Sequence, residues 1–245
     1  MVALDGLADT VRVQRAPERS VSCPGIEGPG NLAWAALDAL ESEVGRPLPV
    51  SVQIEKAIPA EAGLGGGSSD AAAVLRAADR LHGLGLGPGR LEAVAARVGS
   101  DVPFFIRGGC QWARGRGETL TPAVAPRFAA LLLRPPEGLS TPRVYAAFDR
   151  MAAPAACDDA AAPPAMPALA GWVRNDLWPP ALALAPSLGA AARALAAAGA
   201  GAVLLCGSGS CLAGLFSGRA EAEAAIARLP AEGLRAVVEP RPPEA

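Results

Sequence analysis

The glycine- and serine-rich stretch Pro59–Ala72, PAEAGLGGGSSDAA, has the residue types of a phosphate-binding loop. Consecutive glycines allow positive φ angles and a close approach of the backbone to a ligand. The N–H groups of such a loop form a concave anion site, and a helix beginning at Ser68 or Ser69 adds its positive end. The serine hydroxyls add donors and a contact for magnesium. The residues predicted to bind phosphate are Pro59, Gly63, Leu64, Gly65, Gly66, Gly67, Ser68 and Ser69.

The loop differs from two common nucleotide motifs. No lysine follows the glycines, as a Walker A loop requires, and the GxGxxG spacing of dinucleotide folds is absent. The simpler alternative is a glycine turn whose serine caps a helix. Three consecutive glycines and two serines at a strand-to-helix turn favour phosphate binding over that alternative.

Asp101, in the stretch GSDVPFF, is the candidate carboxylate for proton transfer from an acceptor hydroxyl. Phosphoryl transfer is mostly positioning and charge stabilisation, so a kinase needs a phosphate cradle, a metal and a group beside the acceptor. The apolar residues after Asp101 would hold its carboxylate partly dry and fixed. From the residues alone, a turn or helix N-cap at Ser100–Asp101 explains the sequence equally well.

Composition excludes several other classes of protein. The net charge is −2, from 22 basic and 24 acidic residues, so neither nucleic acid nor a membrane is an expected partner, and an anionic small molecule stays open. His82 is the only histidine, and the five cysteines form no CxxC pair, which argues against zinc and against a Ser-His-Asp triad. The odd cysteine count predicts reduced thiols and a cytoplasmic location.

Hydrophobic periodicity predicts the elements that position these residues. Strands are expected at Thr10–Gln14, Val50–Ile54, Ala129–Leu133, Ala202–Cys206 and Arg235–Glu239, with a hairpin at Trp112–Leu120. Helices are expected at Asn31–Val44, Ser68–Leu81, Pro88–Val98 and Ala181–Ala198. Gly99–Phe105 is predicted to be a turn, Met151–Pro167 a surface loop, and the tail PRPPEA frayed. The alternation indicates an α+β protein with a junction near Pro122–Pro126, which gives domains 1–125 and 126–245.

One uncharged stretch, Ala194–Gly218, is long enough to cross a membrane. Its centre reads CGSGSC, which would place poorly helical backbone at mid-bilayer. We therefore expect a helix end, a buried strand, a glycine loop and a second strand. The first residues include early acids and no apolar core, so no signal peptide is expected.

The glycine loop resembles the phosphate loop of the GHMP kinases, which include galactokinase, homoserine kinase and mevalonate kinase. Other stretches are similar to the members that phosphorylate the 2-hydroxyl of a cytidine-diphosphate-linked sugar alcohol, in the non-mevalonate route to isoprenoids. These stretches are GSDVPFFIRGG, ARGRGETLTP, STPRVYAAFD, NDLWPPALALAP and GSGSCLAGLF. The resemblance runs from about Asp5 to the C-terminus.

The resemblance implies a two-domain, α+β GHMP kinase fold. Its N-terminal part would be like ribosomal protein S5 domain 2, and its C-terminal part would be ferredoxin-like. It further implies ATP and Mg²⁺ as cofactors and the cytidine-diphosphate sugar alcohol as the small-molecule partner. The protein is expected to be a monomer or a weak dimer.

Single residues also take roles from the resemblance. It makes Asp101 the catalytic, substrate-facing carboxylate, places Lys56 and Asn31 on the adenine side of the ATP site, and matches Tyr145 to an aromatic that stacks on cytosine. The second glycine loop, Gly207–Ser210, would brace the phosphate loop from the other domain. The residues themselves leave simpler alternatives open: a solvated strand-end charge for the lysine, an N-cap for the asparagine, and a core position for the tyrosine.

The match breaks at the N-terminus. Such members begin with a strand carrying an alanine-lysine-isoleucine-asparagine motif, followed by an aspartate-glycine-tyrosine-histidine motif. Met1 falls after both, and Lys56 is the only lysine. We expect either a start codon placed too far downstream or trimmed residues, or else a degenerate paralogue that binds nucleotide without transferring phosphate. The chain as written is expected to have little kinase activity and an exposed sheet edge. A GHMP kinase for another small alcohol is the other alternative.

Overall fold

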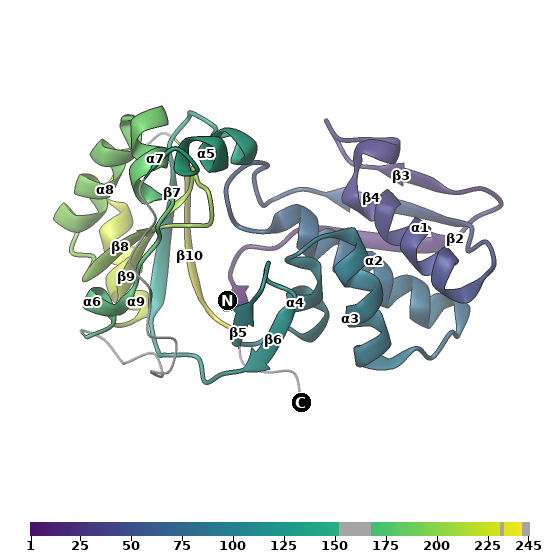
Figure 1. Ribbon diagram of the computed structural model, residues 1–245. Helices are drawn as coiled ribbons and strands as arrows, with labels where there is room; N and C mark the ends of the chain where they lie inside the picture. The colour runs from purple at the N-terminus through teal and green to yellow at the C-terminus, as the bar shows by residue number, and fades with distance from the viewer. Residues whose placement is uncertain (152–167, 231–232, 242–245) are drawn as a thin grey trace.

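Two lobes lie side by side in the computed structural model, which describes residues 1–151, 168–230 and 233–241 (Figure 1). The lobe on the right contains a three-stranded sheet in the order β2-β4-β3, and the lobe on the left a five-stranded sheet in the order β1-β10-β7-β9-β8. The β5-β6 hairpin lies low between them. The strands are β1 Leu4–Asp5, β2 Thr10–Arg15, β3 Ser20–Ser22, β4 Val50–Glu55, β5 Gln111–Arg114, β6 Thr119–Pro122, β7 Ala129–Arg134, β8 Ala202–Leu205, β9 Leu212–Phe216 and β10 Leu234–Pro240.

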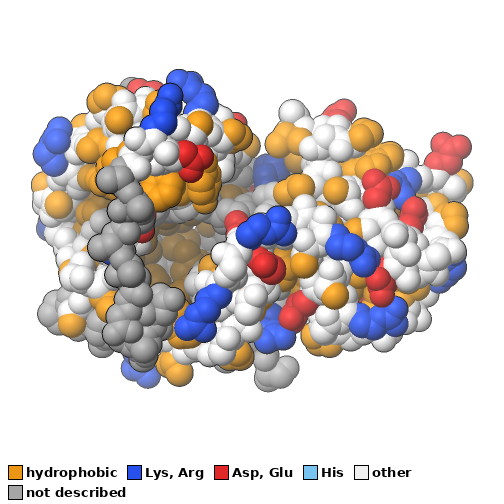
Figure 2. Space-filling view, viewed as in Figure 1, with side chains coloured by type: hydrophobic (Ala, Val, Ile, Leu, Met, Phe, Trp, Pro, Cys, Tyr) orange, Lys and Arg blue, Asp and Glu red, His pale blue; other side chains and the backbone are white. Residues whose placement is uncertain are grey.

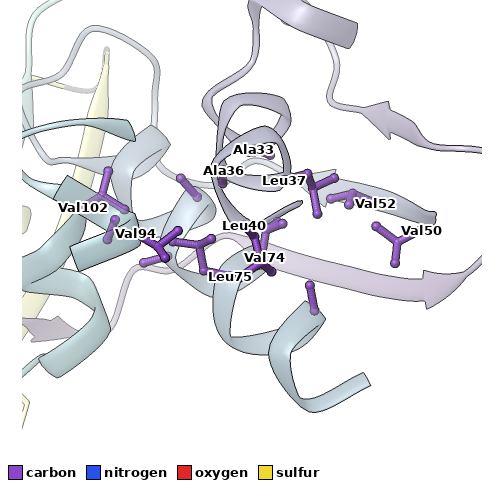
Figure 3. Close-up of a cluster of buried hydrophobic side chains, with 14 of the residues drawn as sticks. Ala33, Ala36, Leu37, Leu40, Val50, Val52, Val74, Leu75, Val94 and Val102 are labelled. Carbon is purple, nitrogen blue, oxygen red and sulfur yellow. The ribbon is translucent and has the colours of Figure 1, made fainter. Parts of the chain in front are cut away.

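The core of the N-terminal lobe lies between its sheet and three helices, α1 (Leu32–Val44), α2 (Gly66–His82) and α3 (Gly87–Val98). Along β4 the apolar residues are buried and the intervening polar ones are less so, as the period of two in the sequence predicts. Figure 3 shows these strand residues meeting apolar side chains of the helices, including Leu37, Leu40, Val74 and Leu75. This core holds the end of β4 against the start of α2, where the glycine loop joins them.

The C-terminal lobe is a β-α-β-β-α-β arrangement, as the ferredoxin-like prediction requires. Its central strand β7 is buried along five of its six residues, which suits an apolar run packed on both faces. Helices of this lobe pack around the sheet (Figure 1). They are α5 Thr141–Phe148, α6 Leu169–Trp172, α7 Trp178–Leu184, α8 Ser187–Ala197 and α9 Arg219–Ile226.

Three sequence predictions were wrong in detail. Gly99–Phe105 was expected to be a turn, but a short helix, α4, runs over Val102–Arg107, because the apolar side chains of VPFF pack against α2 and α3. The single helix expected over Ala181–Ala198 is two helices, bent by 118°, with Pro186 at the break. Helix α2 begins at Gly66, two residues earlier than expected.

The other predicted strands and helices are present, within a few residues of their expected ends. The 3-10 turn Gly28–Gly30 and the elements β1, β3, α5, α6 and α9 are additions that the periodicity did not reveal. The loop expected at Met151–Pro167 lies outside the described residues after its first residue, as does most of the C-terminal tail. The division into domains 1–125 and 126–245 stays a prediction, and β1 crosses it by pairing with β10.

The uncharged stretch Ala194–Gly218 forms a helix end, two antiparallel strands and the loop between them, as expected. Among the described residues, no one helix has both the length and the apolar character to cross a bilayer. In that part of the chain, the bent pair of α7 and α8 would meet those two criteria when the two helices are taken together.

Candidate active site

The phosphate-loop candidate connects the end of β4 to the start of α2. Gly65 is the N-cap and has a φ of 71°, a left-handed conformation that glycine adopts without steric cost. The first backbone bond that closes the helix runs from Ser69 N to Gly65 O, at 2.9 Å. The N–H groups of Gly66, Gly67 and Ser68 are therefore left at the open helix end, where an anion is favoured.

The earlier start of α2 changes the position of the two serines. Both lie in the first turn of the helix instead of capping it. The Ser69 hydroxyl donates to Gly66 O at 2.8 Å, so it is occupied within the helix. Among the described residues, no hydrogen bond is made by the Ser68 hydroxyl, which is the better placed of the two to contact a ligand.

The second glycine loop, Gly207–Ser210, packs against the phosphate loop backbone to backbone. Ser210 N donates to Glu61 O at 3.2 Å, and Cys211 N donates to Ala62 O at 3.1 Å. A side chain on Gly63 would collide with the carbonyl oxygen of Cys206. The prediction that the second loop braces the first from the other lobe is confirmed.

A cavity of about 440 Å³ lies where the two loops meet, between the lobes. Figure 2 shows a notch between the lobes at the top of that view, with α5 on one side and the segment that precedes α1 on the other. Every predicted site residue except Ser69 contributes to its lining: Asn31, Lys56, Pro59, Gly63, Leu64, Gly65, Gly66, Gly67, Ser68, Asp101 and Tyr145. Ser69 lines a neighbouring cavity of about 260 Å³.

The cavity also contains residues that the sequence patterns did not single out. These include Cys23 and Ile26 from the segment before α1, and Thr141 and Ser208, whose hydroxyl oxygens are 2.7 Å apart. The last pair joins α5 to the second glycine loop. Ser208 belongs to the second glycine loop, whereas Cys23, Ile26 and Thr141 were identified only by the packing of distant segments.

Asp101 is exposed and lies directly before α4. It occupies the N-cap position, but its side chain makes no capping bond, and the described residues give it no hydrogen-bond or ion-pair partner. Although the residue is exposed, the surrounding protein removes enough water to raise the pKa of its carboxyl group. Its side chain is thus available to a ligand, as a proton acceptor or a metal contact would be.

Lys56 is not the solvated strand-end charge that its position in the sequence allowed. Its Nζ donates to Asp9 Oδ2 at 2.5 Å and to Asp70 Oδ2 at 2.8 Å. Burial by itself would lower the pKa of Lys56, but the bonds to the two carboxylates outweigh burial and raise it. Burial raises the pKa of Asp70 to about 6, and Lys56 opposes that shift.

Asn31 is a helix N-cap, as one interpretation of the sequence held. Its Oδ1 accepts from Ala33 N at 2.9 Å, and its Nδ2 donates to Ile26 O at 2.9 Å. Tyr145, in contrast, is 50% exposed on α5, so the core interpretation of this residue was wrong. Its ring is free to stack on a ligand in the cavity.

The described residues contain no cluster of three or more His, Cys, Asp or Glu side chains that could hold a metal ion. A Mg²⁺ ion bound with a nucleotide needs less than that, because it keeps several waters and uses one or two carboxylates together with the phosphates. The unpaired carboxylate of Asp101 and the hydroxyl of Ser68 fit this requirement.

Comparisons with known proteins agree with this geometry. Residues 31–109 match the GHMP kinases N terminal domain, and residues 165–235 match the GHMP kinases C terminal domain. The chain is 42% identical over 229 residues to 4-diphosphocytidyl-2-C-methyl-D-erythritol kinase of Synechococcus sp. (strain JA-3-3Ab), covering 86% of this chain and 74% of that protein. It is 39% identical to the enzyme of the same name from Corynebacterium efficiens, covering 98% of this chain and 80% of the relative.

A crystal structure of 4-(cytidine 5'-diphospho)-2C-methyl-D-erythritol kinase has a TM-score of 0.75 and 34% identity to this chain, covering 96% of it and 87% of that structure. Homoserine kinase from Cytophaga hutchinsonii has the same TM-score at 16% identity, covering 99% and 90%, which shows the shared fold alone. The chain belongs to the GHMP kinase family and, within it, to the group of 4-diphosphocytidyl-2-C-methyl-D-erythritol kinases.

Proposed function

We propose that this protein binds ATP at the glycine loop and transfers its γ-phosphoryl group to the 2-hydroxyl of 4-diphosphocytidyl-2-C-methyl-D-erythritol. The relatives named for this reaction are 39–42% identical over most of the chain. The observation that carries the proposal is the shared cavity. It places the unpartnered carboxylate of Asp101 and the open end of α2 in one space between the lobes.

In this proposal the chain's own groups position the reactants. The first-turn N–H groups of α2 and the Ser68 hydroxyl bind the phosphates, with Mg²⁺ neutralising their charge when bound. The nucleotide's adenine lies toward Asn31 and Lys56, and the acceptor's cytosine stacks on Tyr145.

Asp101 accepts the proton of the acceptor hydroxyl as its oxygen forms a bond to the γ-phosphorus. The bond between that phosphorus and the β,γ-bridging oxygen breaks, and ADP leaves. A cytoplasmic location fits the free thiols of the four cysteines that the structure describes.

A single-turnover assay with γ-labelled ATP tests the proposal, because it detects slow transfer. We expect label in the cytidine-linked acceptor. Homoserine and mevalonate serve as competing acceptors. Transfer to either in preference to the cytidine-linked acceptor would favour a different GHMP kinase, and ATP binding without transfer to any acceptor would favour a non-catalytic nucleotide-binding protein.

The variant Asp101→Asn separates chemistry from binding. It keeps the size of the side chain and removes the proton acceptor, so the transfer rate should fall by about 10²–10⁴-fold. Its affinity for ATP, measured without Mg²⁺, should stay close to that of the unaltered chain. An unchanged transfer rate would remove Asp101 from the mechanism.

A further inference from the structure

Three charged side chains form a largely buried network beside the phosphate loop. Asp9 precedes β2, Lys56 follows β4, and Asp70 lies in the second turn of α2. The side chains of the two acids are only 2% and 5% exposed, and that of the lysine is 22% exposed. The network therefore joins three separate segments of the chain, and its Lys56 and Asp70 also contribute to the lining of the cavity.

Asp9 also binds the backbone of the loop itself. While its Oδ2 accepts from Lys56, its Oδ1 accepts from Ala57 N at 2.7 Å and from Ile58 N at 2.8 Å. Ile58 packs against the start of α2, because a Cβ on Gly66 would lie 2.9 Å from its Cγ2. One carboxylate thus fixes both the chain leaving β4 and the side chain that touches the first turn of the helix.

The charges explain why both acids are needed. The Lys56 ammonium lies close beneath the first turn, 3.2 Å from where a Cβ on Gly66 would be, at the positive end of the helix. A cation at that end is disfavoured, and a partly buried one is costly unless it is paired. The two carboxylates hold the ammonium in place, and they use two of its three N–H donors.

We propose that Asp9 is a positioning residue for the nucleotide: through Ile58, Lys56 and Asp70 it fixes the phosphate loop and the start of α2 in the geometry that receives the phosphates. The inference rests on the nucleotide binding proposed above, and it extends that proposal to a residue outside the glycine motif. In this arrangement Lys56 acts mainly through the loop and the helix. The competing account is that Lys56 binds a phosphate directly and that Asp9 merely draws it away.

The variants Asp9→Asn and Asp9→Ala distinguish the two accounts. Asparagine keeps an oxygen for the two backbone N–H groups but places an amide N–H₂ against the ammonium, whereas alanine removes both sets of contacts. Asp38→Asn is the matched control, because Asp38 makes an exposed ion pair with Arg19 on the surface of α1. Urea unfolding verifies that each variant folds, and isothermal titration calorimetry with MgATP measures the dissociation constant.

The expected result is a dissociation constant raised roughly tenfold in Asp9→Asn, since a misplacement of about 1 Å can cost up to about 10²-fold. Asp9→Ala should bind more weakly still, and Asp38→Asn should match the unaltered chain. Combining Lys56→Met with Asp9→Asn should weaken binding no more than Lys56→Met alone, since both changes disrupt one network. If Asp9→Ala does not fold, the Asp9→Asn and Lys56→Met pair decides the question.

Equal or tighter binding by Asp9→Asn would overturn the inference and favour direct contact between Lys56 and a phosphate. The inference would also be overturned if Lys56→Met weakened MgATP binding by the same factor in the unaltered chain and in Asp9→Asn. If the unaltered chain bound no MgATP, the proposed function and this inference would both be overturned. If the unaltered chain and Asp9→Asn bound MgATP equally well, only the role of Asp9 would be contradicted.

Discussion

At the scale of single residues, the site depends on carboxylates in contrasting surroundings. Asp101 is exposed to the cavity and has no partner among the described residues, while Asp70 is buried and bound to Lys56. Burial raises the pKa of both carboxyl groups. The first carboxylate is placed to exchange a proton with a ligand, and the second to stabilise the loop.

The pH dependence of transfer should reveal Asp101. A general base works only when ionised, so transfer should decline as the pH falls through its raised pKa. Single-turnover rates measured across a series of acidic to neutral pH values would follow this decline. The same acid limb should persist in Asp70→Asn, and its disappearance in that variant would assign the decline to Asp70 instead.

Asp70 should make the folded state less stable as the pH rises. Its folded pKa of about 6 lies above the ordinary value of 3.8, so the folded protein holds the proton more tightly. The stability from this group is fully present below the ordinary value and is lost as the pH rises through about 6. Urea unfolding should therefore show Asp70→Asn gaining stability relative to the unaltered chain between pH 4.5 and 7.5 (about the window of the shift).

The comparison between Asp70→Asn and the unaltered chain matters because His82 adds its own pH dependence to the stability of both. Burial lowers the pKa of His82, so its contribution to stability is lost as the pH falls, the opposite sign. Both chains contain His82, and its effect cancels in the difference. A difference that does not change with pH would contradict the raised pKa of Asp70.

At the scale of elements, the contact between the two glycine loops is the feature that joins the lobes at the site. Gly63 has a φ of 72°, and its α-carbon faces the carbonyl of Cys206. No side chain fits there, so both the conformation and the space require glycine. The loop sequence therefore serves two purposes, since some glycines approach the ligand and this one approaches the second loop.

Gly63→Ala should separate the loops and weaken MgATP binding by tenfold or more, at roughly 1.4 kcal/mol for each factor of ten. Gly85→Ala is the matched control, because Gly85 has a similar φ of 63° but nothing within 4 Å of an added Cβ. Gly85→Ala should lose about 1–2 kcal/mol of stability to the left-handed conformation, and Gly63→Ala should lose more because its Cβ also collides with Cys206 O. Binding by calorimetry, measured beside urea unfolding, would show whether only Gly63→Ala loses affinity; equal affinities would contradict the bracing role.

At the scale of the whole molecule, the site is assembled from both lobes. The cavity takes the glycine loop, Asp101 and the residues near α1 from one lobe, and α5 with the second glycine loop from the other. A ligand in the cavity contacts both lobes. Because it binds only the folded state, it should stabilise the arrangement in which the lobes lie together.

Hydrogen exchange should therefore detect MgATP in two distant parts of the sequence. Amides at 63–68 and at 207–210 should both exchange more slowly when MgATP is bound, because the loops are bonded to each other. Amides of α9, which contributes no residue to the cavity, are the internal control and should change little. Protection confined to 63–68 would contradict a site shared by the lobes.

Local patterns in the sequence determined much of the fold and of the site. Three features could be predicted from the sequence because each depends on residues within a few positions of one another. They are the alternation in β4, the N-cap at Asn31 and the glycine loop. The residues and the resemblance together indicated Asp101, the resemblance alone indicated Tyr145, and the structure places both in the same cavity as the loop.

Only the tertiary structure decided how distant residues pair. Asp9 reaches Lys56 across 47 residues, and no spacing predicts that contact. The helix at Val102–Arg107 and the strand β1 likewise depend on packing against other elements, which short segments cannot specify alone. The physical reason is the same in each case: burial and charge pairing are set by what surrounds a residue in space, and the sequence records only its neighbours along the chain.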